Sequence, residues 1–306
     1  MAVPRKHHYV PECYLINFTD TEKDSRIIQV FSKEKKTSFK TSVSNVGHIR
    51  DFYRLDASEG IDDEFGIETK MLAPMEGAAA PVLRKIIQEE KLPEDPVQLA
   101  RLWTFIAFLA MRGPLSREHA AEVVDRTAKD WAQAFAAKGT PQDLKVLYDR
   151  MNTPERNRMN LEQLKDIANS KHYKFKTTQN YILSLTLDYA RRLAPLLAKR
   201  DWCILVASSG QFITSDQPVL VHWSRRVRIK HGRGFGSESN ELIVPLSPRI
   251  CLSGTFEPGQ KKAILSADSV SKLNAEISKS PCKFLFFRDK NFLQIKPNGR
   301  NHQLFE

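Results

Sequence analysis

Apolar and polar residues follow two different spacings along this chain. Residues 8–18 and 26–55 are rich in the β-branched and aromatic residues that favour extended strands. The stretch RIIQVFSKEKKTSFKTSV places two such runs around the polar sequence SKEKK, which predicts a hairpin. DFYRLD, at 51–56, is a third short strand candidate and is followed by turn-forming residues.

The spacing changes near residue 62, where apolar residues begin to recur every three or four positions, as on one face of a helix. Pro74 and Pro81 interrupt the first helical segment, and each removes a backbone donor there. The segment 96–114 is apolar nearly all round, which predicts a helix in the middle of a helical layer. Further helices are predicted at 115–138, at 160–169 and from residue 177 onward.

The last third of the chain returns to short β-prone runs, interrupted by one helix that Ser266 and Ser269 can cap. This order predicts an α+β fold with N-terminal β elements, a central helical layer and a mainly antiparallel C-terminal sheet. We expect a single domain over residues 1–306. It comprises β elements at 1–60, a helical region at 61–200 and a β-rich region with one helix at 201–306. The N-terminal β elements are expected to join the C-terminal sheet.

Composition changes this picture little, because 41% hydrophobic and 27% charged residues are ordinary for a soluble globular protein. The sequence has no apolar run of the length that a membrane-spanning helix needs, so we expect no membrane partner. Basic residues near the N-terminus are not followed by the apolar stretch of a secretory signal. The four cysteines are scattered without a CxxC pair, which favours the reduced cytoplasm over a disulfide framework or a Cys-rich zinc site.

Charge adds a candidate partner. The net charge is +11, from 47 Lys and Arg against 36 Asp and Glu, and cationic surfaces attract nucleic acid and other polyanions. The densest cationic stretch is SRRVRIKHGRG, and its candidate nucleic-acid-binding residues are Arg225, Arg226, Arg228, Lys230 and Arg233. On an edge strand the same charges would instead prevent pairing between sheets of different molecules.

Several separated phrases indicate a family. HHYVPECYLINF at 7–18, FIAFLAMRGP at 105–114, FITSDQPV at 212–219, VPLSP at 244–248 and LNAEI with FLFFRD at 273–289 occur in this order. With them the chain resembles the bacterial domain-of-unknown-function family 4238 over nearly its whole length. The resemblance implies an intracellular bacterial protein, of a kind found in mobile elements and phage-defence loci. It implies no settled biochemistry.

His7 and His8 are the first candidates for chemistry. Side chains alternate along a strand, so these two are expected to point to opposite faces and only one to enter a site. The resemblance favours His8, which directly precedes Tyr9, Val10 and Pro11. As a functional residue His8 would be a general base or a metal ligand. Alternatively it hydrogen-bonds a buried turn that Pro11 fixes.

FITSDQPV delivers Asp216 to the end of an apolar strand, where a carboxylate can serve as a metal ligand or catalytic base. The alternative is a turn in which Asp216 bonds the backbone amide two residues on. Arg112 ends a very apolar helix and must meet a carboxylate or a bound anion. It is either a phosphate clamp or half of a structural ion pair, and the resemblance suggests Glu68, Glu76 or Asp216 as its partner.

Glu68 and Glu76 lie within about 80° of each other around a regular helix, beside its apolar stripe. Two carboxylates and a histidine can bind a divalent ion for phosphodiester hydrolysis. For Glu76 a solvated helix edge is the favoured interpretation.

Two hypotheses follow from these residues. In the first, the protein is a phage-defence or mobile-element effector with a metal-dependent nuclease site. His8, Asp216 and Glu68 would hold a divalent metal, with His8, Asp216 and Arg112 in catalytic roles. In the second, it is a non-catalytic sensor or binding module, and the same residues form a buried polar network. The first requires His8 and Asp216 to share one cleft, within reach of a hydrogen bond or of one ion.

Overall fold

The computed structural model describes residues 5–20, 26–57, 60–170, 173–223 and 234–289, and the backbone of 294–295 and 301–302. The chain forms two compact units. The main unit combines Met1–Pro114 with Thr186–Glu306, and the helical unit is the continuous segment Leu115–Leu185. The single domain expected over residues 1–306 remains a prediction.

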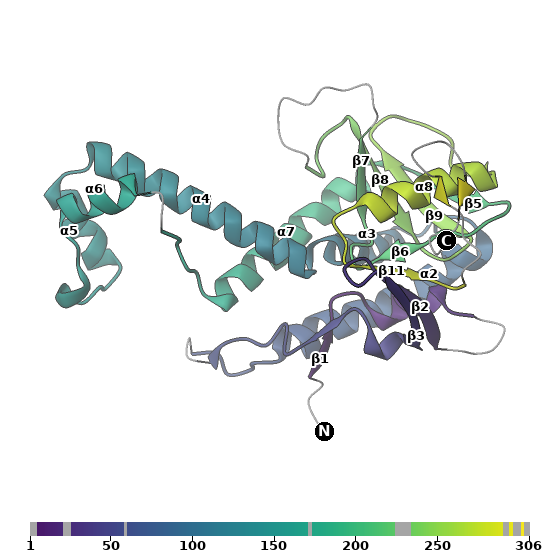
Figure 1. Ribbon diagram of the computed structural model, residues 1–306, viewed down its shortest axis with the longest axis horizontal. Helices are drawn as coiled ribbons and strands as arrows, with labels where there is room; N and C mark the ends of the chain where they lie inside the picture. The colour runs from purple at the N-terminus through teal and green to yellow at the C-terminus, as the bar shows by residue number, and fades with distance from the viewer. Residues whose placement is uncertain are drawn as a thin grey trace. The chain divides into compact units, whose positions relative to one another are not determined.

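The predicted α+β class is confirmed, with strands near both ends of the chain and helices between them (Figure 1). The strands are β1 (Lys6–His8), β2 (Ile27–Ser32), β3 (Thr37–Ser42), β4 (His48–Arg50), β5 (Asp201–Ala207), β6 (Thr214–Ser215), β7 (Leu220–Trp223), β8 (Asn240–Pro245), β9 (Ile250–Thr255), β10 (Lys262–Leu265), β11 (Phe284–Phe287), β12 (Gln294–Ile295) and β13 (Asn301–His302). The helices are α1 (Glu12–Leu15), α2 (Ala73–Glu89), α3 (Pro96–Met111), α4 (Pro114–Lys138), α5 (Pro141–Arg150), α6 (Leu161–Asn169), α7 (Gln179–Ala198) and α8 (Ala267–Lys279). Within the described ranges, no helix is long and apolar enough to cross a membrane.

The larger sheet of the main unit has the strand order β10-β5-β9-β8-β7, and only the β10–β5 pair is parallel. Alternation along β5 sends Leu205 to the face where Val270 of α8 packs. Trp202 points to the other face and stacks on Trp103 of α3, with ring centroids 4.7 Å apart. A Cβ on Gly254, opposite Trp202 in the ladder, would lie 2.8 Å from its ring. This position therefore requires glycine.

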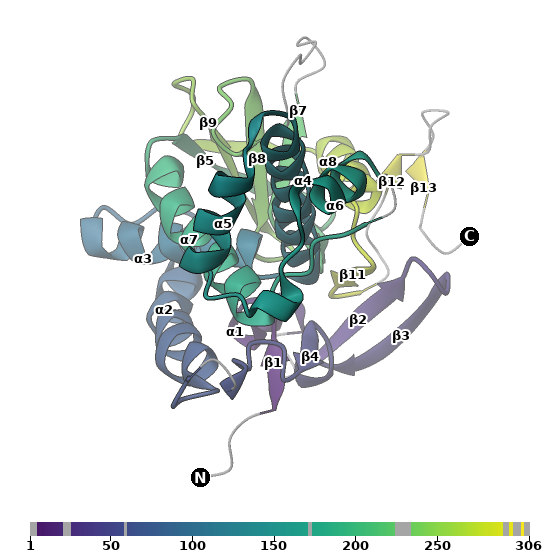
Figure 2. The same cartoon turned by 90° about the vertical axis from the view of Figure 1, so that its left-hand side faces the viewer.

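The second sheet joins both ends of the chain, in the antiparallel order β3-β2-β11-β6 (Figure 2). The predicted hairpin is β2 and β3, connected by a turn over the polar residues 33–36. Ile277 of α8 packs against this sheet beside Leu285 and Phe287, so α8 contacts both sheets. The expected union of N-terminal and C-terminal strands is confirmed for β2 and β3. It is wrong for β1, which pairs with β4 in a two-stranded sheet.

The segment 8–18 is mostly helical rather than extended. After β1, Pro11 precedes α1 and its carbonyl accepts hydrogen bonds from the amides of Tyr14 and Leu15. A 3-10 turn over Ile16–Phe18 follows. Tyr14, Leu15 and Phe18 are fully buried, and a spacing of one and four residues suits a helix face better than a strand face.

DFYRLD is not a strand either. The strand lies just before it, at β4, and Asp51 ends that strand with a left-handed φ of 53°. Residues 51–53 form a turn in which the amide of Arg54 donates to the Asp51 carbonyl.

A buried arginine closes one end of the larger sheet. Arg200, just after α7, is 5% exposed and donates to the carbonyls of Phe235, Asn240 and Gly254 and to Oδ1 of Asn240. Its guanidinium also lies over the ring of Phe256, 4.2 Å from the centroid. These bonds tie the end of α7 to β8 and β9.

The helical unit contains most of α4 together with α5, α6 and the first residues of α7. Its core is built on small residues, because Ala132 and Ala136 of α4 pack against Ala168 of α6. The sequence analysis did not predict α5, although Leu144, Leu147 and Tyr148 are spaced as on one helix face; only Leu144 of the helix is buried. The signal that was present is the capping box between Thr140 and Asp143.

Candidate functional site

Arg112 is the centre of a polar network in the main unit. Its side chain is 1% exposed and lies at the end of α3. Nε donates to the Tyr9 carbonyl and Nη2 to the His8 carbonyl, both at 3.0 Å, and Nη1 bonds Oε1 of Glu76 at 2.7 Å. Burial, the largest single influence, lowers the pKa of Arg112, but the charge of Glu76, the charge of Tyr53 and the hydrogen bond to Glu76 together raise it by more.

The partner of Arg112 is thus Glu76, one of the three carboxylates proposed from the resemblance. The interpretation of Glu76 as a solvated helix edge is wrong, because its carboxylate faces the buried guanidinium. Glu68 lies nearby in the π-helical turn Ile67–Leu72 that precedes α2. Burial, and then the charge of Glu76, raise the pKa of Glu68 to about 7, while Arg112 lowers it. Its Oε2 is buried without a hydrogen-bond partner among the described residues.

His7 has a structural role in the main unit. It is fully buried, and its Nδ1 accepts a hydrogen bond of 2.8 Å from the amide of Tyr53. The two rings stack with centroids 5.8 Å apart, and the Tyr53 hydroxyl donates to the carbonyl of Arg112. His7 and Tyr53 thereby connect β1 and the turn after β4 to the end of α3.

His8 points away from His7, as the strand alternation predicted. Its ring meets the ring of His48 across the β1–β4 pair, with centroids 5.3 Å apart. Nε2 lies 3.6 Å from Oε1 of Glu12 and has no hydrogen-bond partner among the described residues. Burial, followed by the charges of His48, Arg112 and Lys6, lowers the pKa of His8 to about 4. The imidazole is therefore neutral at pH 7.

Asp216 is 5% exposed and bonds to the neighbouring strand. Its Oδ1 accepts from the amides of Lys283 at 2.9 Å and Phe284 at 3.2 Å, where β11 begins. The local turn expected of Asp216 is made instead by Ser215, whose Oγ accepts from the amide of Gln217. Burial raises the pKa of Asp216 against the opposing effect of these amide bonds.

The predicted metal ligands do not gather. No group of three or more His, Cys, Asp or Glu side chains that could hold an ion occurs in the described ranges, which include His8, Glu68 and Asp216. His8 lies beside Glu12 and His48, whereas Asp216 is bonded to the start of β11. The expectation that these three hold one ion stays a prediction.

Residues that the sequence did not single out connect the same phrases. The Tyr14 hydroxyl donates to the Pro245 carbonyl at 2.6 Å and lies 2.7 Å from Oγ1 of Thr214. The side-chain amide of Asn274 donates to the Gln211 carbonyl and accepts from the amide of Ile213. The available signal was a polar group inside an apolar run, because such a group needs a buried partner.

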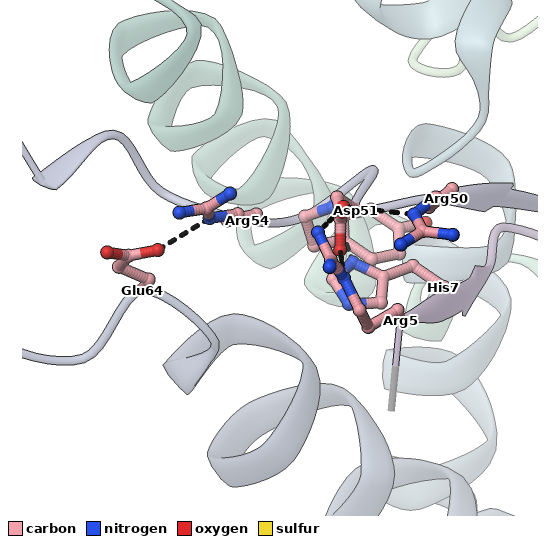
Figure 3. Close-up of polar contacts among 7 residues, drawn as sticks. Arg5, His7, Arg50, Asp51, Arg54 and Glu64 are labelled. Carbon is pink, nitrogen blue, oxygen red and sulfur yellow. Dashed lines mark hydrogen bonds and ion pairs between the residues drawn. The ribbon is translucent and has the colours of Figure 1, made fainter. Parts of the chain in front are cut away.

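Exposed arginines lie beside His7, around the turn after β4 (Figure 3). Arg5 forms two bonds with the Asp51 carboxylate, of 3.0 and 2.5 Å, and Arg50 lies 3.6 Å from the same group. Arg54 bonds Glu64 at 2.5 Å. We call these three arginines the arginine cluster. Their side chains are 49%, 72% and 45% exposed, so all three reach solvent.

The five cationic residues predicted to bind nucleic acid lie outside the described residues. They are Arg225, Arg226, Arg228, Lys230 and Arg233.

Every phrase named from the sequence is connected through these contacts. Arg112 bonds the HHYVP phrase, Tyr14 of that phrase reaches TSDQPV and VPLSP, and Asn274 and the start of β11 bond the strand that carries Asp216. The class so defined is an α+β protein whose separated sequence phrases are linked to one another by hydrogen bonds of buried polar side chains. The chain belongs to the family described as Protein of unknown function (DUF4238), whose sequence pattern matches residues 6–291. No curated protein and no solved structure matches it.

Proposed function

We propose that this protein is a non-catalytic nucleic-acid-binding module. In it the motif residues hold the fold together, and exposed cations contact the phosphates. The supporting observation is that the charged groups of Arg112 and Asp216 bond main-chain atoms, and that Arg112 is in addition paired with Glu76. Groups bonded in this way are positioned to fix the sheets to the helices.

The cations available for binding fall into two sets. One is the cationic stretch 225–233, which lies outside the described residues. The other is the arginine cluster, in which Arg5 and Arg50 lie against one carboxylate, Asp51, and Arg54 bonds Glu64. Arginine is suited to phosphate because its planar guanidinium can donate two parallel hydrogen bonds.

The test is the salt dependence of binding to a fluorescein-labelled DNA duplex of about 20 base pairs, measured by anisotropy. Arg50→Gln should weaken binding at every sequence and reduce the slope of log K against log salt by about 1. Arg50 is the suitable target because it is the most exposed of the cluster. Replacement of Arg225, Arg226 and Arg228 with Gln should reduce the slope further.

Lys272→Gln is the matched control, since Lys272 is an exposed cation of α8 that is paired with Asp268. It should leave affinity and slope unchanged. Absence of salt-dependent binding by the wild-type protein would contradict the proposal. If Lys272→Gln weakened DNA binding as much as Arg50→Gln, the arginine cluster would contribute no more than any other exposed positive charge.

A second candidate, a metal-dependent phosphodiesterase, is favoured by one observation. Nε2 of His8 and Oε2 of Glu68 are buried polar atoms without a hydrogen-bond partner among the described residues. Such atoms are suited to a ligand or to proton transfer. Hydrolysis of DNA or RNA with Mg²⁺ or Mn²⁺, lost in His8→Ala while the thermal transition is kept, would support this candidate. It would also contradict the non-catalytic proposal.

The resemblance adds a setting for this proposal. It implies a role in phage defence or in mobile elements, so we propose foreign nucleic acid as the target. The four cysteines are free thiols in the structure, which is the state expected in the cytoplasm. We place the protein there as part of the same proposal.

A further inference from the structure

The helical unit contains an open pocket of about 620 Å³ between α5 and the segment that leads into α6. This volume lies within the range of about 300–1,000 Å³ that is usual for small-molecule sites. Leu144, Met159 and Leu161 supply apolar surface to it, and Tyr148 adds an aromatic ring. Both elements belong to one unit, as their neighbouring ribbons in Figure 1 illustrate.

Local hydrogen bonds fix the walls of this pocket. Capping boxes hold the first turns of α5 and α6, through Thr140 and Asn160 respectively. The amide of Met159 donates to the Tyr148 hydroxyl at 3.1 Å, which ties the connecting segment to α5. Arg158 donates to the Thr153 carbonyl and pairs with Asp149 at 2.9 Å. The walls are thus held by hydrogen bonds within the helical unit, so binding would require little ordering.

The charges around the pocket favour an anion. Lys145, Arg158 and Lys165 line it, against one carboxylate, Glu162. Arg158 is already neutralised by Asp149. Neither Lys145 nor Lys165 forms an ion pair with a residue that the structure describes. Among the residues that the structure describes, one positive charge of the lining therefore remains without a countercharge beside the apolar and aromatic surface of the pocket.

We propose that this pocket binds a small anion with a planar apolar body, of the size and chemistry of a nucleoside monophosphate. The ring system would lie against Tyr148, Leu144 and Leu161, and the phosphate would meet Lys145 and Lys165. Stacking on an aromatic side chain and contact with lysine charge are the interactions that such a molecule offers. No lining residue of this pocket belongs to the proposed nucleic-acid surface.

The experiment is isothermal titration calorimetry of the full chain with three probes: AMP, adenosine and inorganic phosphate. AMP should bind with a dissociation constant of about 1 mM or lower, which corresponds to about 4 kcal/mol. Adenosine and phosphate each lack half of the contacts and should bind at least about tenfold more weakly. Absence of saturable heat with AMP up to about 10 mM would overturn the proposal.

Lys145→Gln with Lys165→Gln should weaken AMP at least about tenfold without changing the melting temperature, because both side chains are exposed. The same pair changed to Arg should retain binding. The matched control is Lys174→Gln with Lys176→Gln, which removes two exposed charges of the helical unit that do not line the pocket. Equal loss of AMP affinity in the two Gln double variants would overturn the proposed site, because it would show a general effect of the protein's charge.

Met159→Trp provides an independent test, because a larger side chain at this half-buried position fills the cavity. It should abolish AMP binding while the cooperative thermal transition is retained. Undiminished AMP binding in Met159→Trp would overturn the assignment. The assignment would also be overturned if a single-stranded oligonucleotide bound through Lys145 and Lys165 while AMP did not bind.

Discussion

Arg112 and Arg200 are both buried guanidinium groups in the main unit, but their surroundings differ in charge. Arg112 donates to two main-chain carbonyls and pairs with Glu76. Arg200 donates to carbonyls and to one amide oxygen, and no carboxylate of the described residues pairs with it. Burial lowers the pKa of Arg200 to about 10, whereas the net shift of the Arg112 pKa is upward.

The difference between the two arginines indicates that oriented carbonyls can hold a buried cation without an opposite charge. Each carbonyl dipole offers part of the stabilisation that water would give, and several together replace the carboxylate. The region around Arg112 uses a full countercharge, so removal of either member leaves an ion behind. Removal of Arg200 leaves only neutral acceptors. The two regions should therefore respond differently to mutation.

The largest expected effect is that of Arg112→Met. The change leaves the Glu76 carboxylate facing a buried apolar side chain, and the free energy of unfolding should fall by about 3–5 kcal/mol. Arg200→Met leaves unbonded but uncharged carbonyls and should cost about 1–3 kcal/mol. Urea unfolding of both variants, followed by circular dichroism, measures the difference. The comparison fails if Arg200→Met is the more damaging of the two.

Glu76→Gln sharpens the comparison, because it converts the Arg112 region into a copy of the Arg200 region. The guanidinium would keep its bonds to the carbonyls of His8 and Tyr9 and gain a neutral amide oxygen. We expect a loss of about 1.5–3 kcal/mol, the value of a hydrogen bond to a charged group. The same urea titration tests it, with the similar but exposed change Glu89→Gln on α2 as a control. A loss as large as that of Arg112→Met would show that carbonyls alone do not suffice there.

Asp216→Asn should have a smaller effect. Its Oδ1 accepts the amides of Lys283 and Phe284, and an Asn oxygen can accept the same two bonds. The free energy of unfolding should change by no more than about 1 kcal/mol. Differential scanning calorimetry measures this change. A loss comparable with that of Arg112→Met would mean that the negative charge of Asp216 is itself needed.

A further expected effect is a dependence of stability on pH at Glu68. The pKa of this carboxyl is raised to about 7 by burial in the folded protein, from 4.5 in the unfolded chain. The folded state therefore holds the proton more tightly, and the stability it contributes is present below pH 4.5 and is lost as the pH rises to 7. Glu68→Gln stays neutral at every pH.

Glu68→Gln should consequently melt at a higher temperature than the wild type above pH 7, and the advantage should disappear as the pH falls toward 4.5. Thermal scans at several pH values compare the two proteins, which share every other titrating group. A constant difference across the range would contradict the raised pKa.

Much of the fold can be predicted from the sequence, because the spacing of apolar residues indicates which side of a helix or strand is buried. The long helices and the C-terminal strands have regular apolar periods, and α3 was recognisable from its apolar surface on all sides. The segment around α1 was misjudged because four helical residues contain too few apolar positions to distinguish a helix from a strand. The π-helical turn gave no signal, since it shares the apolar positions of the helix it precedes.

The site was predictable in part. A charge at the end of the apolar helix α3 had to be paired, and Arg112 is paired. The partner could not be chosen among carboxylates, because that depends on how α2 packs beside α3. Likewise, a carboxylate at a strand end, such as that of Asp216, indicates a hydrogen bond. Its distant donor could not be predicted, because only the fold brings the two groups together.

The pairing of β2 with β11 has a consequence for synthesis on the ribosome. β2 emerges early, yet its neighbour in the sheet is among the last segments translated. Tyr14 likewise waits for Thr214, 200 residues further on. At about 5–20 residues per second, β2 can pair with β3 early but remains without β11 for many seconds. The helical unit, a continuous segment, can complete its contacts while the main unit is still being made. During that interval the nascent chain presents the edge of β2 that later pairs with β11, and this is the surface that a chaperone would need to cover.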